Sequence, residues 1–133
     1  MKPKIYLSHS SNYDFQNNLY NPIKLSKLRG EYDFVFLLDT PNYLPNTKEL
    51  IKSYSAVVAE MSYPSTGAGI EIGWADALRI PIIFIHNELY NPPPYLKTMS
   101  PHIIKYDKST EIPLLLEPVL KRIIWIPLNI KLL

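Results

Sequence analysis

Residues 56–86 read AVVAEMSYPSTGAGIEIGWADALRIPIIFIH, which combines two strand signals with a helix signal between them. Ala56 to Met61 and Pro81 to His86 are short, nearly continuous apolar runs, as expected for parallel strands that are covered on both faces. Between them, a serine-rich turn and the glycines at 67 and 69 lead into a helix that runs to about Arg79. The stretch therefore predicts two strands of a parallel sheet with a helix connecting them.

The same alternation continues in both directions along the chain. Three further runs of β-branched or aromatic residues are predicted as strands, namely Lys4 to Leu7, Asp33 to Leu38 and His102 to Tyr106. The helix signals that separate them are a proline-to-glycine frame from Asn21 to Gly30, a capping box of Asn46 and Glu49, and an apolar helix from about Ser109 that Pro118 is predicted to kink. This alternation predicts a doubly wound α/β sandwich with a five-stranded, mainly parallel sheet.

The composition limits both the number of domains and the function. The 133 residues, 47% of them hydrophobic and 20% charged, suit one packed domain over residues 1–133 and disfavour disorder. A net charge of +2 without a basic block gives no support for binding to polymeric nucleic acid or to a membrane surface. No cysteine is present, and His9, His86 and His102 lack the spacing of metal ligands, so neither a metal nor another cofactor is expected.

Ligands of doubly wound sheets bind outside the carboxyl ends of the strands. The polar residues that follow the predicted strands are therefore candidate site residues, namely Ser8, His9, Ser10, Asp39, residues 62–67 and residues 86–88. After the third strand, the glycines at 67 and 69 permit close backbone approach, and the amides at the start of the helix favour an anion. This turn is suited to hold a phosphate while Glu71 stays ionised.

Pro64 to Gly73, together with the opening Ile5 to Ser10, resembles the nucleoside 2-deoxyribosyltransferase family, and most closely its hydrolase branch, the 2'-deoxynucleoside 5'-phosphate N-hydrolases. The family pattern Pro-Ser-x-Gly-x-Gly-x-Glu-x-Gly is met at Pro64, Ser65, Gly67, Gly69, Glu71 and Gly73. The match covers residues 55–86 well and the first strand loosely. The resemblance implies one domain of this family over residues 1–133, with a flavodoxin-like sheet.

The resemblance implies that Glu71 is a nucleophile that attacks C1' of the sugar, expels the base and forms a glycosyl-enzyme intermediate. A carboxylate placed against an electron-poor anomeric carbon stabilises an oxocarbenium-like transition state and then captures it. Water as the acceptor gives hydrolysis, and a second base gives transfer. In the hydrolase branch, the serine and the first glycine of the pattern bind the 5'-phosphate. These match Ser65 and Gly67, which favours a nucleotide substrate.

The chain departs from the family pattern at two places. His9 stands where the first loop of the family usually has a glycine, so the contacts to phosphate or sugar differ there. The auxiliary aspartate of the family falls near Thr47, where this chain has no acid. Glu49 is a nearby substitute, but its place in the capping box explains it equally well. The sequence therefore leaves the second catalytic carboxylate unassigned.

Each candidate residue also has a structural interpretation. Glu71 fits a glutamate in the first helical turn that complements the helix dipole, which is worth ~0.3–1 kcal/mol, and His9 fits a strand-closing residue. Trp74 shares a helix face with Glu71 and either stacks near the base or packs in the core. Asp39 either serves the site or forms a turn. The residues interpreted as structural are Glu60, for hydrogen bonding, and Tyr6 and Tyr13, for packing, although either tyrosine could reach the sugar.

The leading hypothesis is an N-glycosidase that cleaves the base-sugar bond of a nucleoside or deoxynucleoside 5'-monophosphate, or a related nucleoside deoxyribosyltransferase. A second enzyme hypothesis keeps Glu71 and makes the substrate NAD or another nucleotide, as in TIR-type domains, which the opening Leu7 to Ser10 faintly resembles. A non-catalytic nucleotide-binding sensor is the alternative from a different class, because the auxiliary acid is missing.

The two ends of the chain bear on assembly and location. Residues 123–130 are more apolar than a solvent-facing terminus should be, which predicts a homodimer or higher homo-oligomer unless the tail packs on its own sheet. The family resemblance implies the same, because related enzymes complete each pocket with residues from a neighbouring subunit. Charges and prolines interrupt any membrane span after residue 112. The first apolar run is too short for a signal peptide, so a cytoplasmic location is expected.

Overall fold

The computed structural model describes residues 1–40 and 46–126, whose five strands form one sheet in the order β2-β1-β3-β4-β5. The strands are β1 (Lys4–Ser8), β2 (Asp33–Val35), β3 (Ala56–Glu60), β4 (Ile82–Asn87) and β5 (Ile103–Tyr106). Every neighbouring pair of strands is parallel. The predicted α/β fold is confirmed, and the sheet is wholly rather than mainly parallel.

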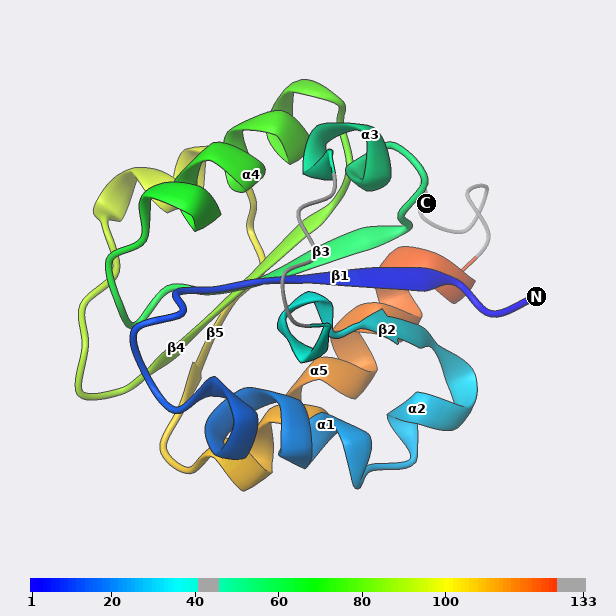
Figure 1. Ribbon diagram of the computed structural model, residues 1–133, viewed down its shortest axis with the longest axis horizontal. Coiled ribbons are helices and arrows are strands. Elements are labelled where there is room, and N and C mark those ends of the chain that lie inside the picture. Colours follow the sequence, from blue (N-terminus) through cyan, green and yellow to red (C-terminus); the bar gives the residue numbers. More distant parts are fainter. Residues whose placement is uncertain (41–45, 127–133) are drawn as a thin grey trace.

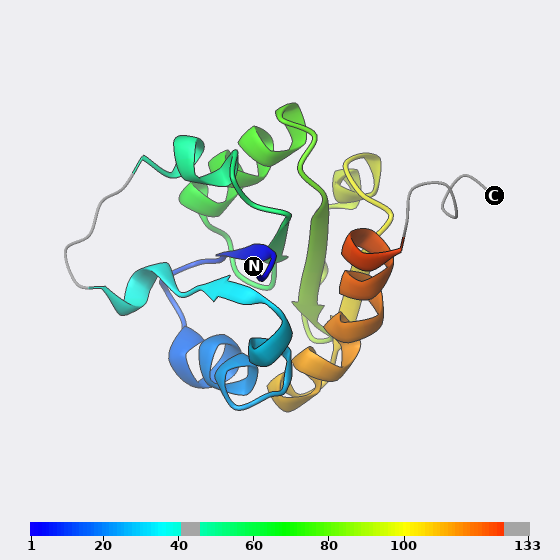
Figure 2. The ribbon, with the colours of Figure 1, turned by 90° about the vertical axis from the view of Figure 1, so that its right-hand side faces the viewer.

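Helices cover both faces of this sheet (Figure 1 and Figure 2). On one face lie α1 (Asn21–Lys24), α2 (Leu28–Glu31) and α5 (Ile112–Leu120), and on the other lie α3 (Thr47–Ile51) and α4 (Thr66–Ala77). After β2 the chain crosses to the other side of β1 to form β3, which is the strand order of flavodoxin-like folds. The carboxyl ends of the strands meet at one edge, on the left in Figure 1.

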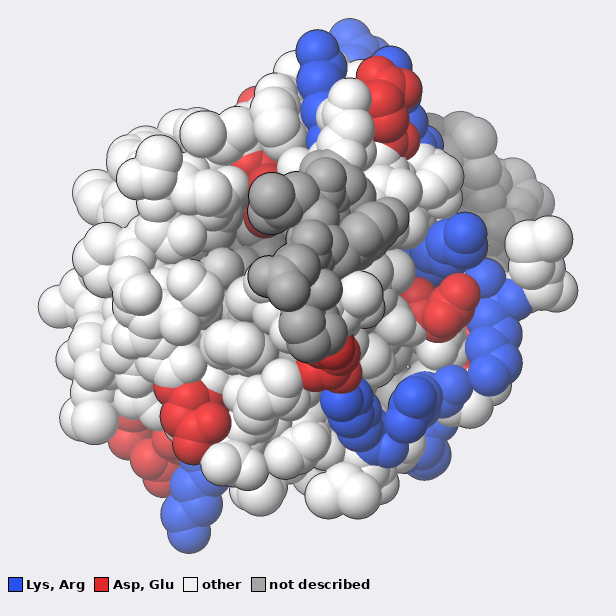
Figure 3. Space-filling view, in the orientation of Figure 1, with Lys and Arg blue, Asp and Glu red and all other residues white. Residues whose placement is uncertain are grey.

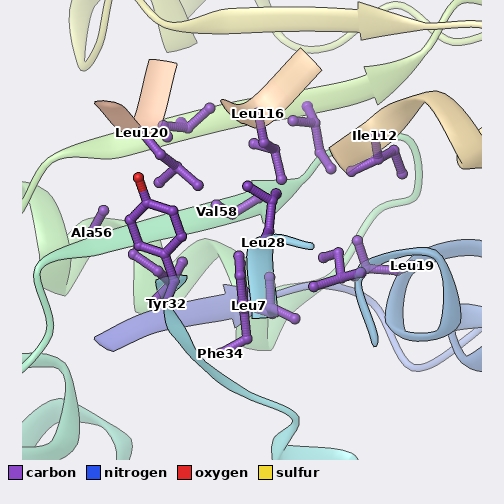
Figure 4. Close-up of a cluster of buried hydrophobic side chains, with 14 of the residues drawn as sticks. Leu7, Leu19, Leu28, Tyr32, Phe34, Ala56, Val58, Ile112, Leu116 and Leu120 are labelled. Atoms are coloured by element: carbon purple, nitrogen blue, oxygen red, sulfur yellow. The ribbon is translucent and has the colours of Figure 1, made fainter. Parts of the chain in front are cut away.

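Alternating side chains of the strands fill two cores. Ile5 and Leu7 of β1 belong to the core under α1, α2 and α5, whereas Tyr6 between them belongs to the core under α3 and α4. In the first core, Val58 of β3 lies in one cluster with Leu116 of α5 (Figure 4). Because β3 is buried along its whole length, its apolar run is continuous rather than alternating.

One predicted strand is shorter in the structure than in the prediction. β2 ends at Val35, and Leu37–Asp39 forms a 3₁₀ turn instead of continuing the strand to residue 38. As an edge strand, β2 pairs only with β1, and this pairing ends where Tyr6 lies opposite Val35. Leu37 and Leu38 after Val35 are therefore not part of the β2–β1 pairing and lie at the carboxyl edge of the sheet.

The prediction of one helix that Asn21-Pro22 opens and that ends just before Gly30 is wrong at both ends. The helical backbone begins earlier, in a π turn at Gln16–Tyr20 that runs directly into α1. Pro22 has no N–H to donate to a preceding carbonyl. The wider π turn before it lets the helical backbone continue through this proline. Gly30 lies inside α2 rather than beyond its end, and the extended backbone of Tyr32 ends that helix.

The sequence signals at the starts of α3 and α4 lie close to the first turns that the structure shows. Asn46 caps α3, since its Oδ1 accepts the N–H of Glu49 at 3.3 Å, but the Glu49 carboxylate binds Lys52 at 3.1 Å instead of completing the capping box. Ser65 caps α4, so Gly67 and Gly69 lie inside this helix rather than before it. α4 ends where Arg79 adopts a left-handed conformation with φ of 60°.

The last helix begins with a 3₁₀ turn at Ser109–Glu111 and stays helical through Pro118 into a π turn at Lys121–Trp125. Ile123 and Ile124 pack against the first core, so the start of the apolar tail folds back on its own domain. The rest of that predicted tail, residues 127–130, lies outside the described residues. Within residues 1–40 and 46–126, no helix is both long and apolar enough to cross a membrane.

Candidate active site

A pocket of about 270 Å³ opens at the carboxyl ends of β1 and β2, beside the start of α4. Its wall consists of Tyr6 and Leu7 of β1, His9 and Ser11 of the next loop, Leu37 and Leu38 after β2, and Ser65, Gly67, Ala68 and Glu71 of the α4 region. The fold thus brings Glu71 into one cavity with His9, Ser65 and Gly67, although His9 is far from the others in the sequence.

Two hydroxyl groups of β1 hold the Glu71 carboxylate. Its Oε1 accepts from the Ser8 hydroxyl at 2.9 Å, and its Oε2 accepts from the Tyr6 hydroxyl. Tyr6 also stacks on Tyr54, with ring centroids 5.5 Å apart, which fixes the position of the phenol. The carboxylate is therefore oriented at both oxygens and keeps further lone pairs for a ligand.

The structure places Glu71 on the second turn of α4, not on the first. The favourable interaction between a carboxylate and the helix dipole fades within the first turn. The interpretation of Glu71 as a first-turn residue that complements the helix dipole is therefore wrong. The hydrogen bonds from the hydroxyl groups of β1 account for its position instead.

Burial raises the pKa of Glu71 above the usual range of a glutamate, because the pocket wall removes water from the charged form. The hydrogen bonds from Tyr6 and Ser8 act in the opposite direction, because they favour the carboxylate. Burial, together with the charge of Glu71, also raises the pKa of Tyr6 far above its ordinary value, so Tyr6 keeps its proton and stays a donor. A poorly hydrated, oriented carboxylate is suited to attack an electron-poor carbon.

The turn before α4 offers hydrogen-bond donors to an anion. Ser65 Oγ accepts the N–H of Ala68 at 3.1 Å, and this cap leaves the hydroxyl proton of Ser65 for a ligand. Thr66 and Gly67 occupy positions whose N–H groups have no partner within a helix. A Cβ built at Gly67 would meet nothing within 4 Å, so the backbone is open there. Because no described residue of the wall is Lys or Arg, these donors would hold the anion.

His9 uses both ring nitrogens inside the protein. Nδ1 lies 2.8 Å from the carbonyl of Ser10, which can only accept, so Nδ1 carries the proton and Nε2 accepts from the Tyr20 hydroxyl at 2.7 Å. Burial lowers the pKa of His9, which favours the neutral ring. The Tyr20 oxygen in turn accepts the N–H of Leu38 at 3.4 Å. His9 therefore ties the first loop to the turn after β2 and has no ring nitrogen left for a phosphate.

The other predicted site residues lie outside the pocket wall. The buried Ser10 hydroxyl accepts a backbone N–H of its own loop. The N–H of Gly69 donates to the carbonyl of the cap residue of α4 at 3.1 Å. Asp39 forms an ion pair with Lys24, and Trp74 packs in the core between α4 and the sheet.

No second carboxylate joins Glu71 among the described residues of the pocket wall. Thr47 opens α3, and Glu49 is exposed on the same helix. Glu60 is buried, but it accepts from Tyr106 on the opposite face of the sheet, in agreement with its hydrogen-bonding interpretation. Across residues 1–40 and 46–126, no three His, Asp or Glu side chains gather as metal ligands.

Sequence reasoning missed the contact between Tyr6 and Glu71. Alternate residues of a strand share a face, so Tyr6, which stands between Ile5 and Leu7, points to the face that α4 covers. A hydroxyl at that position can reach a polar side chain of the next helix. The alternation in β1 was therefore a signal that could have identified Tyr6 as a partner of the candidate nucleophile.

No protein-family profile matches the chain, and no curated protein matches it. Among solved structures, the CMP N-glycosidase BcmB of Clostridium botulinum is 24% identical, with a TM-score of 0.66 over 87% of this chain and 98% of BcmB. A signal receiver domain from Vibrio parahaemolyticus is 10% identical, with a TM-score of 0.56 over 92% of this chain and 93% of that domain. A conserved protein of Enterococcus faecalis is 14% identical, with a TM-score of 0.56 over 90% of this chain and 99% of that protein.

At these sequence identities, the similarities establish the fold alone. They include an enzyme and a signalling domain, so the shared architecture does not select one function. The chain therefore has the flavodoxin-like α/β fold, and its function has to be argued from the side chains of the pocket.

Proposed function

We propose that the protein is an N-glycosidase that cleaves the base-sugar bond of a nucleoside 5'-monophosphate, with Glu71 as the nucleophile. The observation that carries this proposal is one pocket that combines an oriented, half-buried carboxylate with a helix N-terminus suited to a phosphate. The similarity to BcmB, a CMP N-glycosidase, shows that this fold can host the same class of reaction. In such a complex, the phosphate binds at Ser65 and Gly67 and the sugar faces Glu71.

The reaction proceeds in two displacements at C1'. A Glu71 oxygen forms a bond to C1' while the bond between C1' and the base breaks, and its electron pair leaves with the base. The base takes up a proton from solvent, and the protein holds a glycosyl ester. Water then attacks C1', which releases the sugar phosphate and a proton and restores the carboxylate. Tyr6 and Ser8 keep the carboxylate oriented for both steps.

A chromatographic screen for free base tests this proposal. The purified protein is incubated with ribo- and deoxyribonucleoside 5'-monophosphates, the matching nucleosides, and NAD, with and without a second base as acceptor. We expect at least one monophosphate to release its base faster than the matching nucleoside. Release from NAD alone would favour the TIR-like alternative, and exchange with the second base would favour a deoxyribosyltransferase.

A nucleotide-binding sensor is the second candidate function, because Glu71 is the one carboxylate among the described residues of the wall. Such a protein would keep the phosphate turn and the pocket without turnover. Thermal stabilisation by nucleotides, combined with no base release in the screen, would select this candidate over the enzyme.

Replacing Tyr6 with phenylalanine is expected to shift the acid limb of the pH profile of kcat/KM to higher pH. Phenylalanine keeps the stacking on Tyr54 but removes a hydroxyl that favours the charged form of Glu71, so the pKa of Glu71 rises further. Because the reaction needs the carboxylate, activity is then lost at a higher pH as the pH falls. Base release is measured across pH for the wild type, Tyr6→Phe and, as a control, Tyr95→Phe, which changes an exposed tyrosine. An acid limb that stays in place in Tyr6→Phe would contradict this role.

We further propose that the active form is a homo-oligomer, most simply a dimer, in which a neighbouring subunit completes the pocket. Ile123 and Ile124 of the tail pack on their own domain, so the surface that supports this proposal is another one. The exposed side chains Leu25 and Leu114 line an apolar groove between α1 and α5. Light scattering is expected to give about twice the 15.4 kDa of one chain, and specific activity is expected to fall on dilution. A fully active species of 15.4 kDa would exclude the shared pocket.

A further inference from the structure

A second pocket, of about 230 Å³, lies at the same edge of the sheet, beyond the carboxyl ends of β4 and β5. It shares no lining residue with the Glu71 pocket. Like that pocket, it lies where flavodoxin-like sheets bind their ligands. None of its lining residues takes part in the proposed glycosidase reaction, so its chemistry needs a separate explanation.

Tyrosine rings dominate the wall of this second pocket. Tyr63 stacks on Tyr13, with ring centroids 4.5 Å apart, and tilts against Tyr90 with centroids 5.0 Å apart. The rings come from the loops after β1, β3 and β4, and Tyr106 of β5 adds a fourth tyrosine. The faces of such rings carry partial negative charge and attract cations.

Two polar groups of the wall are also electron-rich. Tyr106 donates its hydroxyl proton to the buried carboxylate of Glu60, so its oxygen can offer only lone pairs to the pocket. The Asp107 carboxylate lines the pocket as well, and no described residue of the wall is Lys or Arg. In Figure 3, acidic side chains lie at the lower left, below the carboxyl ends of the strands in Figure 1, with a basic side chain beside them.

One hydroxyl of the wall is unsatisfied. The Tyr13 hydroxyl is buried and has no hydrogen-bond partner among the described residues. Burial raises the pKa of Tyr13, so the group keeps its proton. Buried polar groups without a partner are rare in native structures.

We propose that this second pocket binds a small organic ammonium cation. The aromatic rings of Tyr63 and Tyr90 and the negative charge of Asp107 attract a positive charge. An anion would be repelled by the Asp107 carboxylate, and an uncharged hydrocarbon would gain no electrostatic attraction from it or from the rings. The site is independent of the proposed reaction at Glu71, because the two pockets have no residue in common.

Choline and its uncharged isostere 3,3-dimethyl-1-butanol form the decisive pair of probes, because they differ only in the nitrogen or carbon atom at the centre of the branched group. Calorimetric titration and thermal shift of the intact protein are expected to show choline binding, and binding of the isostere at least about fivefold weaker. Absence of choline binding up to the millimolar range, or equal binding of the two probes, would overturn the proposal.

Variants locate the binding in this pocket. Tyr90→Leu removes a ring and Asp107→Asn removes a charge, and each is expected to weaken choline binding about two- to fivefold. Tyr95→Leu, at an exposed tyrosine outside both pockets, is the matched control and is expected to bind choline as the wild type does. Choline binding that survives both Tyr90→Leu and Asp107→Asn, or that Glu71→Gln abolishes, would refute the assignment. These readouts use binding alone, so they stand even if the protein releases no base.

Discussion

Base release by the Glu71→Gln variant is expected to fall about a thousandfold or more below the wild-type rate. Glutamine keeps the volume of the side chain and can still accept from Tyr6, but it lacks the charge that attacks C1' and stabilises the oxocarbenium-like transition state. The rate is measured as kcat/KM on the best monophosphate from the screen. A variant that keeps more than about a tenth of the wild-type activity would remove Glu71 from the chemistry.

The thermal stability of Glu71→Gln distinguishes a loss of catalysis from a loss of folding. Burial raises the pKa of Glu71 in the folded state, so protonation stabilises the fold at low pH, and this contribution is lost as the pH rises through the folded-state pKa. At neutral pH the neutral glutamine avoids that penalty, so the thermal midpoint of Glu71→Gln is expected to equal or exceed that of the wild type. Asp76→Asn makes the same chemical change at an exposed position of α4 and should keep full activity.

Ser65→Ala is expected to lower kcat/KM for 5'-monophosphates about ten- to a hundredfold while it spares the matching nucleosides. A hydrogen bond to a charged group contributes roughly 1.5–3 kcal/mol, which corresponds to this range. Ser65 also caps α4, and loss of the cap costs ~1 kcal/mol of folding stability, but that loss affects both substrates alike. The ratio of kcat/KM for a nucleotide to that for its nucleoside therefore isolates the phosphate contact.

Ser65→Asp is the matched variant for this prediction. Aspartate can accept the N–H of Ala68 as the serine does, so α4 keeps its cap, but its charge repels a phosphate. We expect activity on nucleosides to persist and activity on monophosphates to fall below that of Ser65→Ala. Equal losses on both substrates in either variant would show that Ser65 supports only the helix.

The fold could be predicted from the sequence because the buried strands are short, nearly continuous runs of apolar residues. The run from Ile82 to Ile85 has no polar interruption and is β-branched or aromatic, which favours a strand covered on both faces. The helical region from Gln16 to Glu31 was harder, because Pro22 and Gly30 carry strong local signals that the packing of α1 and α2 overrides. Local preferences of this kind are weaker than the burial of an apolar face.

The candidate site was predictable where one short motif carries it. Ser65, Gly67 and Glu71 lie close together in the sequence, and one strand-turn-helix unit brings them to the pocket. The hydroxyl groups that hold Glu71 come from β1, 63 and 65 residues away in the sequence. The alternation in β1 indicates which face of the sheet Tyr6 occupies, but it does not indicate which residue of the covering helix Tyr6 meets. His9 was ambiguous for the same reason, since its ring partners depend on where Tyr20 packs.

Mass spectrometry of the protein during reaction with a 2'-fluoro-2'-deoxynucleoside 5'-monophosphate tests the nucleophilic role of Glu71 directly. The fluorine withdraws electrons from C1' and slows the attack of water on the glycosyl ester, so the intermediate accumulates. We expect one equivalent of base to be released and one sugar phosphate to be attached to the peptide that contains Glu71, with neither event in Glu71→Gln. Release of base without an adduct, an adduct on another residue, or no release from any monophosphate would contradict the account.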